Sequence, residues 1–268
     1  MAERSLLIDQ GNTRIKWLNT SDGDGDGDLG GAVAEQGDFA AFRRYCERSA
    51  RPDRVLLSNV AGFERERAVA DLCASLWSLE VRALRATTQQ AGVRNAYESP
   101  GMLGVDRWLA IVGAAARYGM PVIVWDLGTA ATLDAVDEDG RHLGGLILPG
   151  PATMLASLEA GTRLEVPASL HENGERDPAT PGRSGAIEAG SIEGGSIKLG
   201  RSTAECISHG VLSAQLGAFE LFRHNLRSAL CAEPQIVVAG GAAAMLRERL
   251  PAGHIYDPLL VFRGMLTA

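Results

Sequence analysis

The stretch Val122–Ala135, V-I-V-W-D-L-G-T-A-A-T-L-D-A, decides the fold that we expect for this chain. Its first four residues are apolar and rich in β-branched side chains, which predicts a buried strand ending at Asp126. The next residues predict a tight turn, because Gly128 permits a positive φ and lets a ligand approach bare backbone. Ala131–Val136 is apolar enough to return as the second strand of a hairpin.

The polar residues of this turn suit a cation or a phosphate group. A carboxylate at a strand end, such as that of Asp126, holds a cation directly or through water. Thr129 offers a hydroxyl and an N–H group to phosphate oxygens. A lone D-x-G-T motif also has a simpler interpretation, in which the Asp and the Thr only satisfy the hydrogen bonds of the turn. The motif alone leaves both alternatives open.

The same pattern occurs near the N-terminus. Leu6–Thr13, L-L-I-D-Q-G-N-T, is an apolar strand followed by Asp9, one residue, a glycine and small polar side chains. Asp9 and Asp126 therefore occupy corresponding positions in two similar halves of a 268-residue chain. Two such turns are typical of duplicated actin-like nucleotide-binding folds, and the chain resembles the superfamily of acetate and sugar kinases, heat-shock ATPases and actin.

This resemblance implies an α/β fold of two duplicated actin-like (ribonuclease H-like) domains, each with a mixed central sheet flanked by helices. We expect an N-terminal domain at 1–118 and a C-terminal domain at 119–268. Domains of this length are common, and 46% apolar residues allow a core in each half. Two Gly-rich segments, 22–28 and 167–199, lack apolar periodicity, and we expect the first to be a surface loop.

Net charge, cysteine pattern and the length of apolar runs indicate which partners the protein binds and in which compartment it is found. The formal net charge of −7 disfavours nucleic-acid binding through bulk electrostatics. The cysteines form no C-x-x-C pair, and Cys46 and Cys73 fall on apolar helix faces, which favours reduced, buried thiols over disulfides or zinc ligands. No signal peptide is expected, and no apolar run approaches the ~20 residues of a membrane helix. We therefore expect a soluble, cytoplasmic protein with no nucleic-acid or membrane partner.

A second informative stretch, Asn95–Trp108, leads into a helix. From Val105 onward apolar residues recur at helical spacing, so Asp106 and Arg107 fall in the first turn of that helix. The helix dipole favours the anionic form of a carboxylate at this position. A helix-start Asp beside a salt-bridged Arg is the simpler interpretation when the pair is considered alone.

Taken in order, these motifs resemble the type III pantothenate kinase family. The resemblance rests on Tyr97, the G-x-D-R run that ends in Asp106-Arg107, and the D-x-G-T turn at Asp126. In that family the G-x-D-R aspartate, here Asp106, is the general base toward the pantothenate hydroxyl. The later segment 200–210 matches the family's G-R-N-T motif with Ser for Asn, which places a pantothenate contact at Thr203. The implied pantothenate-binding residues are Tyr97, Gly104, Val105, Asp106, Arg107 and Thr203.

The resemblance also implies that the first turn binds the triphosphate of ATP and its Mg²⁺, which Asp9 would hold through water. Lys16 either reaches the phosphates or is simply solvated at a strand edge. A second carboxylate near ATP would repel the phosphates unless a cation stood between them, so Asp126 is expected to hold a monovalent cation, K⁺ or NH₄⁺. The implied ATP-binding residues are Asp9, Gln10, Gly11, Asn12, Thr13, Arg14, Ile15, Lys16 and Thr129.

The activity implied is ATP-dependent phosphorylation of pantothenate to 4′-phosphopantothenate, the first step of coenzyme A biosynthesis, by a homodimer. One alternative is another small-molecule kinase of the same superfamily, against which the G-x-D-R motif argues. The other is a non-catalytic nucleotide-binding regulator. The intact set of Asp9, Asp106 and Asp126 argues against a pure binder, because binding alone needs no general base.

Overall fold

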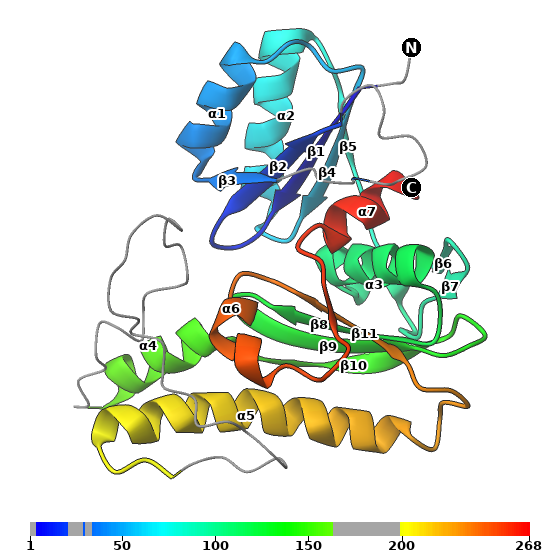
Figure 1. The fold of residues 1–268 in the computed structure, drawn as a ribbon. Helices are drawn as coiled ribbons and strands as arrows, with labels where there is room; N and C mark the ends of the chain where they lie inside the picture. Colours follow the sequence, from blue (N-terminus) through cyan, green and yellow to red (C-terminus); the bar gives the residue numbers. More distant parts are fainter. Residues whose placement is uncertain (1–3, 21–28, 30–33, 163–198) are drawn as a thin grey trace. The chain divides into compact units, whose positions relative to one another are not determined.

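The computed structural model describes residues 4–20, 29, 34–162 and 199–268, which form two compact units (Figure 1). The first unit comprises Met1–Val122, Ala135–Gly144 and Leu259–Ala268, and the second comprises Ile123–Asp134 and Gly145–Pro258. The expected loop at 22–28 and nearly all of 167–199 lie outside the described residues. The domain boundary near residue 118 stays a prediction. No helix in the described ranges has the length and apolarity needed to cross a membrane.

The first unit is built on a mixed five-stranded sheet with the order β3-β2-β1-β4-β5. Strand β1 pairs antiparallel with β2 and parallel with β4, so the N-terminal hairpin predicted from the sequence is confirmed. The edge strand β3 has only three residues, none of them buried, and the sequence gives no sign of it. The strands are β1 Ser5–Gln10, β2 Ile15–Asn19, β3 Glu35–Gly37, β4 Arg54–Asn59 and β5 Val81–Ala83.

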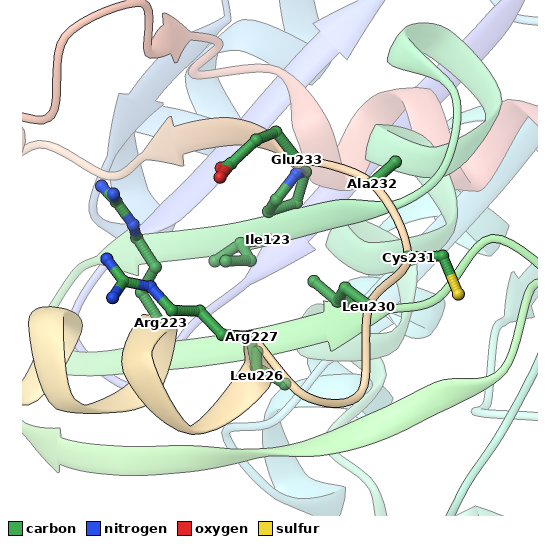
Figure 2. Close-up of a pocket in the computed structure, with 9 residues that line it drawn as sticks. Ile123, Arg223, Leu226, Arg227, Leu230, Cys231, Ala232 and Glu233 are labelled. Atoms are coloured by element: carbon green, nitrogen blue, oxygen red, sulfur yellow. The ribbon is translucent and has the colours of Figure 1, made fainter.

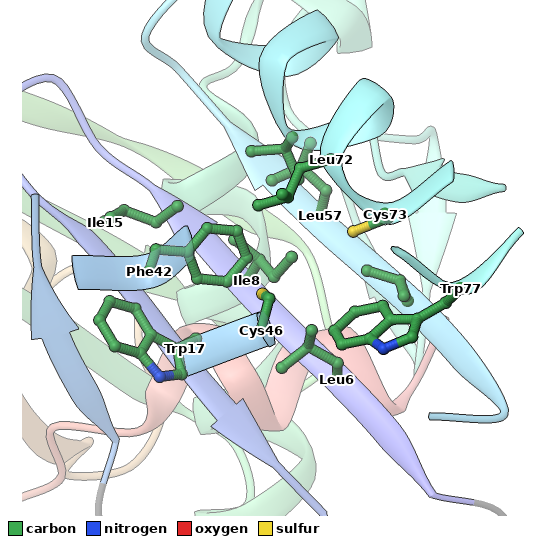
Figure 3. Packing of buried hydrophobic residues seen from close by; sticks show 12 residues of the cluster. Leu6, Ile8, Ile15, Trp17, Phe42, Cys46, Leu57, Leu72, Cys73 and Trp77 are labelled. Atoms are coloured by element: carbon green, nitrogen blue, oxygen red, sulfur yellow. The ribbon is translucent and has the colours of Figure 1, made fainter. Parts of the chain in front are cut away.

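Side-chain alternation along these strands divides the core of the first unit into two clusters. On one face, Leu6, Ile8 and Trp17 pack against helices α1 (Phe39–Arg48) and α2 (Phe63–Trp77), as Figure 3 shows. On the other face, the strands supply Leu7, Leu18 and Leu56, which pack against side chains of helices α3 (Val105–Tyr118) and α7 (Leu260–Leu266).

Helices α3 and α7 approach each other closely at two glycines. A Cβ atom on Gly113 of α3 would collide with the backbone oxygen of Leu260, and one on Gly264 of α7 would collide with that of Leu109. Between β5 and α3 the chain forms a short hairpin, β6 Gln89–Gln90 and β7 Val93–Arg94, and then the 3-10 turn η2 Pro100–Met102. The C-terminal helix of the chain is therefore part of the first unit.

The second sheet has the order β10-β9-β8-β11-β12, which repeats the first sheet position for position. Strands β1 and β8 are both central, both end in an aspartate turn, and both pair with the strand that follows them in sequence. This correspondence confirms the predicted duplication. The strands are β8 Val122–Leu127, β9 Ala130–Val136, β10 His142–Pro149, β11 Gln235–Ala239 and β12 Ile255–Tyr256.

The described part of the second unit contains four helical segments: α4 Pro151–Gly161, α5 Thr203–Leu226, α6 Ala243–Leu246 and the 3-10 turn η4 Arg247–Arg249. The ring of Phe219 on α5 stacks on Trp125 of β8 with centroids 4.7 Å apart, which fixes the long helix against the central strand. Leu155, Ile207 and Val211 form a smaller apolar cluster between α4 and α5.

Candidate functional site

The turn between β1 and β2 is short and tightly closed. Asp9 is opposite Lys16 and Gln10 opposite Ile15, so only Gly11–Arg14 form the loop. The Gly11 amide donates to the Arg14 carbonyl at 3.0 Å, and Gln10 Nε2 donates to the Gly11 carbonyl at 2.8 Å. Asn12, Thr13 and Arg14 are exposed at the tip. The loop therefore exposes polar side chains and backbone, and its binding of an anion stays a prediction.

The residues flanking this turn point to opposite faces of the sheet. Asp9 and Lys16 share the face of Leu7 and Leu18, which α3 and α7 cover. Ile15 belongs to the opposite cluster and is 2% exposed, so its side chain is part of the core and only its backbone is available to ATP.

The G-x-D-R motif forms the start of α3, with Gly104 as the N-cap residue. Asp106 is partly buried, and its Oδ1 accepts a hydrogen bond from the Arg107 amide at 2.7 Å. An additional Cβ atom on Gly104 would lie 2.7 Å from that same oxygen, so the glycine leaves room for the carboxylate. Because α3 packs on the sheet face that carries Asp9 and Lys16, these residues and Asp106 lie on one side of the first sheet.

Arg107 and Tyr97 are in direct contact. Arg107 is buried, and its Nη1 donates to the Tyr97 hydroxyl at 3.1 Å. The Tyr97 ring in turn stacks on His142, with centroids 6.3 Å apart and an angle of 14° between the rings. Sequence reasoning missed His142, because the fold brings it to Tyr97 from the distant start of β10 and no local pattern marks it.

The second aspartate turn is supported by two glycines. Gly240, at φ +86°, allows the end of β11 to lie against Asp126, since a Cβ atom there would be 2.5 Å from the Asp126 Oδ1. A Cβ atom on Gly150 would collide with the Gly128 carbonyl, and the Gly150 amide donates to the Thr129 carbonyl at 2.9 Å. Each glycine directly follows a strand, β10 or β11, and a glycine after an apolar strand is the sequence pattern that marks such a close approach of backbones.

The electrostatic surroundings of Asp126 include the phenol of Tyr256 on β12. Burial raises the pKa of Tyr256 above its usual value of 10.0, and the negative charge of Asp126 raises it further. The carboxylate of Asp126 is itself only partly buried. Its charge therefore acts on the neighbouring strand while the carboxylate remains within reach of a small cation.

Thr203 is the first residue of α5 and is exposed. Ser202 is the N-cap: its Oγ accepts a hydrogen bond from the Glu205 amide at 3.2 Å, while Glu205 Oε2 accepts one from the Arg201 amide at 2.6 Å. The first bond is an N-cap, and the second resembles that of a capping box, except that Glu205 accepts from the residue before the N-cap. Serine therefore performs the capping at the position where the resemblance leads one to expect asparagine.

Two cavities in the described part of the chain lie away from these residues. One, of about 170 Å³, is lined by the end of α5 and the start of β8 and includes Arg223 and Arg227 (Figure 2). The other, of about 450 Å³, lies near β5 and β6. No predicted site residue lines either cavity. The described residues also contain no cluster of three His, Cys, Asp or Glu side chains suited to a metal ion.

The donor groups at the two aspartate turns nevertheless fit the expected cations. Mg²⁺ prefers oxygen ligands and keeps several waters, so one carboxylate such as Asp9, together with substrate phosphates, is a sufficient protein contribution. At Asp126, the partly buried carboxylate offers its oxygens at the strand end, where a cation can reach them. Both sites offer oxygen rather than nitrogen or sulfur, as hard cations require.

Comparison with known proteins identifies relatives across nearly the whole chain. The family model for type III pantothenate kinase matches residues 5–224. The type III pantothenate kinase of Nitrosospira multiformis is 34% identical over 263 residues, which cover 98% of this chain and 89% of that protein.

Two solved structures have a similar fold. One is a Campylobacter jejuni protein assigned to the Baf family of transcriptional activators (TM-score 0.56, 21% identity, 97% of this chain and 95% of that one). The other is the Clostridium difficile activator of 2-hydroxyisocaproyl-CoA dehydratase (TM-score 0.50, 13% identity, 98% of this chain and 94% of that one). At these identities the likeness concerns the fold alone. Together with the two mixed, helix-flanked sheets, it confirms the predicted actin-like α/β fold.

Proposed function

Because the chain belongs to the type III pantothenate kinase family, we propose that it transfers the γ-phosphoryl group of ATP to the hydroxyl of pantothenate. The products are ADP and 4′-phosphopantothenate, and the reaction is the first step of coenzyme A biosynthesis. The observation that carries the proposal is the start of α3, where Asp106 lies in the first turn and the buried Arg107 is bonded to Tyr97.

Asp106 acts as the general base. Its position in the first helical turn and the hydrogen bond from the Arg107 amide both stabilise the carboxylate as an anion. An anionic carboxylate accepts the proton of the pantothenate hydroxyl as that oxygen attacks the γ-phosphorus. Positioning and charge neutralisation provide most of the catalysis in phosphoryl transfer, so the fixed location of this carboxylate matters as much as its basicity.

Arg107 and Tyr97 bind pantothenate. Pantothenate carries one carboxylate, and a guanidinium is suited to a planar oxyanion because it can donate two parallel hydrogen bonds. The hydrogen bond to Tyr97 and the burial of Arg107 restrict the rotamers of that side chain before substrate arrives. Gly104 and Val105 contribute backbone at the same helix start, and Thr203 adds a hydroxyl at the start of α5.

The β1–β2 turn binds the phosphates of ATP, with Lys16 and the residues from Gln10 to Arg14 as donors and Thr129 as a further hydroxyl. Asp9 holds Mg²⁺ through water. When bound, Mg²⁺ neutralises charge on the transferring phosphoryl group. Asp126 would hold K⁺ or NH₄⁺, and that cation would offset the negative charge of the carboxylate.

We further propose that the protein is a cytoplasmic homodimer. Strand β10 is an edge strand that exposes Leu146 and, at 64%, Ile147. Apolar side chains on an open strand edge suit a subunit interface better than free solvent. Sedimentation of the wild-type chain and of Ile147→Lys tests this: the substitution should convert dimers to monomers, and a monomeric wild type would contradict the proposal.

A coupled assay of ADP release, with and without pantothenate, tests the activity. The wild-type protein should release ADP only when pantothenate is present, and a panel of sugars and short carboxylates should not replace it. Asp106→Asn should lower kcat by about 10²–10⁴-fold, the usual loss for a general base, while ATP binding measured by calorimetry stays unchanged. ADP release that depended on another substrate, or near wild-type kcat in Asp106→Asn, would contradict the assignment.

A further inference from the structure

Ser58 is a buried hydroxyl that the predicted site does not include. It is the fifth residue of β4 and is 0% exposed. Its Oγ has no hydrogen-bond partner among the residues that the structure describes. An unsatisfied buried hydroxyl destabilises a protein by about 1–3 kcal/mol, so such a group calls for an explanation, of which a bound ion or its water is one.

The strand register places Ser58 beside Asp9. Strands β1 and β4 run parallel, and Asp9 is the register partner of Ser58. Neighbouring strands lie about 4.8 Å apart, and register partners point to the same face. Alternation confirms the direction, since Leu56, two residues before Ser58, lies in the same cluster as Leu7, two residues before Asp9.

Lys16 extends this row on the other side of Asp9. It is the antiparallel register partner of Asp9 and shares its face. Three strands thus present an ammonium, a carboxylate and a hydroxyl in line, at the ends where β1 and β4 both reach their C-termini. In open α/β sheets, ligands bind at the carboxyl ends of parallel strands.

We propose that Ser58 belongs to the magnesium site: its hydroxyl hydrogen-bonds a water of the Mg²⁺ that Asp9 holds. A metal that keeps several waters needs partners for those waters beyond its one carboxylate. A spacing of one strand between Asp9 and Ser58 suits a bridging water rather than a direct bond. This inference rests on the role proposed for Asp9, and it makes Ser58 a positioning residue rather than a metal ligand.

Removal of the Ser58 hydroxyl should affect the stability of the protein and its affinity for Mg²⁺·nucleotide differently. In a purely structural role, Ser58→Ala changes only the stability of the protein. In the proposed role, the ligand-free protein becomes as stable as the wild type or more stable, because an unsatisfied buried hydroxyl is lost. The affinity for Mg²⁺·AMP-PNP falls about tenfold, the scale of a hydrogen bond to a charged group, while metal-free nucleotide binds as before.

Calorimetric titration of AMP-PNP with and without Mg²⁺ measures the two affinities without turnover, and thermal unfolding measures stability. Ser5→Ala is the matched control. Ser5 begins β1 at the opposite end of the same strand pair, is equally buried, and its Oγ accepts a hydrogen bond from Arg54 Nε at 2.7 Å. Its removal should lower the unfolding temperature and leave Mg²⁺·AMP-PNP affinity unchanged.

Ser58→Cys keeps the test valid if the alanine variant folds poorly, because a thiol fills the same space but is a weak hydrogen-bond partner. It should show the same loss of Mg²⁺·AMP-PNP affinity. Equal Mg²⁺·AMP-PNP affinities in wild type and both variants would overturn the inference while leaving the kinase proposal intact. Equal losses with and without Mg²⁺ would also overturn it, since they would indicate a direct phosphate contact. Absence of pantothenate-dependent turnover in the wild type would instead contradict the proposed function.

Discussion

Replacing Gly104 by alanine should damage catalysis with little effect on stability. Gly104 has φ −51°, so alanine adopts its backbone conformation without strain. The new Cβ atom would lie 2.7 Å from Asp106 Oδ1. Ordinary C···O contacts are about 3.3 Å or longer, so the carboxylate must move by roughly 0.6 Å. A displacement of 1 Å from the productive geometry can cost about 10²-fold, so we expect kcat to fall by about 10- to 100-fold.

The stability change should stay within about 1 kcal/mol. Alanine is a poorer N-cap than glycine, but it restricts the unfolded chain, and these two effects oppose each other. The steady-state ADP-release assay and thermal unfolding measure both quantities on one preparation. Gly101→Ala is the neutral control, since a Cβ atom there meets nothing within 4 Å. Gly113→Ala is the opposite control, because its Cβ atom collides with the Leu260 backbone and should lower stability. Wild-type kcat in Gly104→Ala would refute the reasoning.

Three further predictions concern other parts of the chain. Activity should rise steeply with the concentration of K⁺ or NH₄⁺ and hardly with that of Na⁺, at constant ionic strength. Asp126→Asn should weaken this dependence on K⁺. Equal rates in Na⁺ and K⁺ would exclude the cation site. His142→Leu should raise the KM for pantothenate about three- to tenfold, because it removes the ring stacked on Tyr97. His142→Phe keeps a ring and should leave the KM unchanged. Equal KM values for the two variants would show that the ring is dispensable. Burial raises the pKa of Cys46 from 9.0 to about 12 and that of Cys73 from 9.0 to about 11, so the folded protein favours the neutral thiols. Because the unfolded chain loses these protons at lower pH, the free energy of unfolding should decrease as pH rises from about 9 toward 12. Urea unfolding at pH 8 and pH 10.5 checks this, and the dependence should weaken when both cysteines are replaced by valine.

Much of the fold follows from local patterns. The strands that precede Asp9 and Asp126 are short apolar runs closed by glycine turns, and periodicity of this kind is decided within a few residues. The helix that begins at Val105 shows its apolar spacing over four turns. By contrast, β10 contains Gly144-Gly145 and exposes most of its residues, so it lacks the alternation that marks a half-buried strand.

In the candidate site, too, the residues marked by a local motif could be predicted, and those defined by contacts distant in the sequence could not. Asp106 and Arg107 could be predicted because their helix start and their motif are adjacent in the sequence. Ser58 and His142 could not, since each acquires its significance only from a neighbour on another strand or loop. The burial of the Ile15 side chain was likewise hidden, because a hairpin turn does not reveal which of its flanking residues face the core.

The membership of α7 in the first unit sets an order for folding during synthesis. One face of the first sheet is covered by α1 and α2, whose cluster ends at Trp77, so it can assemble while the ribosome is still making the rest of the chain. The opposite face needs Phe262 and Met265, which emerge only after the whole second unit. At about 5–20 residues per second this delay lasts roughly ten to forty seconds. During that interval Leu7 and its neighbours lack the contacts that Phe262 and Met265 provide, and the side of the sheet that carries Asp9 is completed only after α7 has been synthesised.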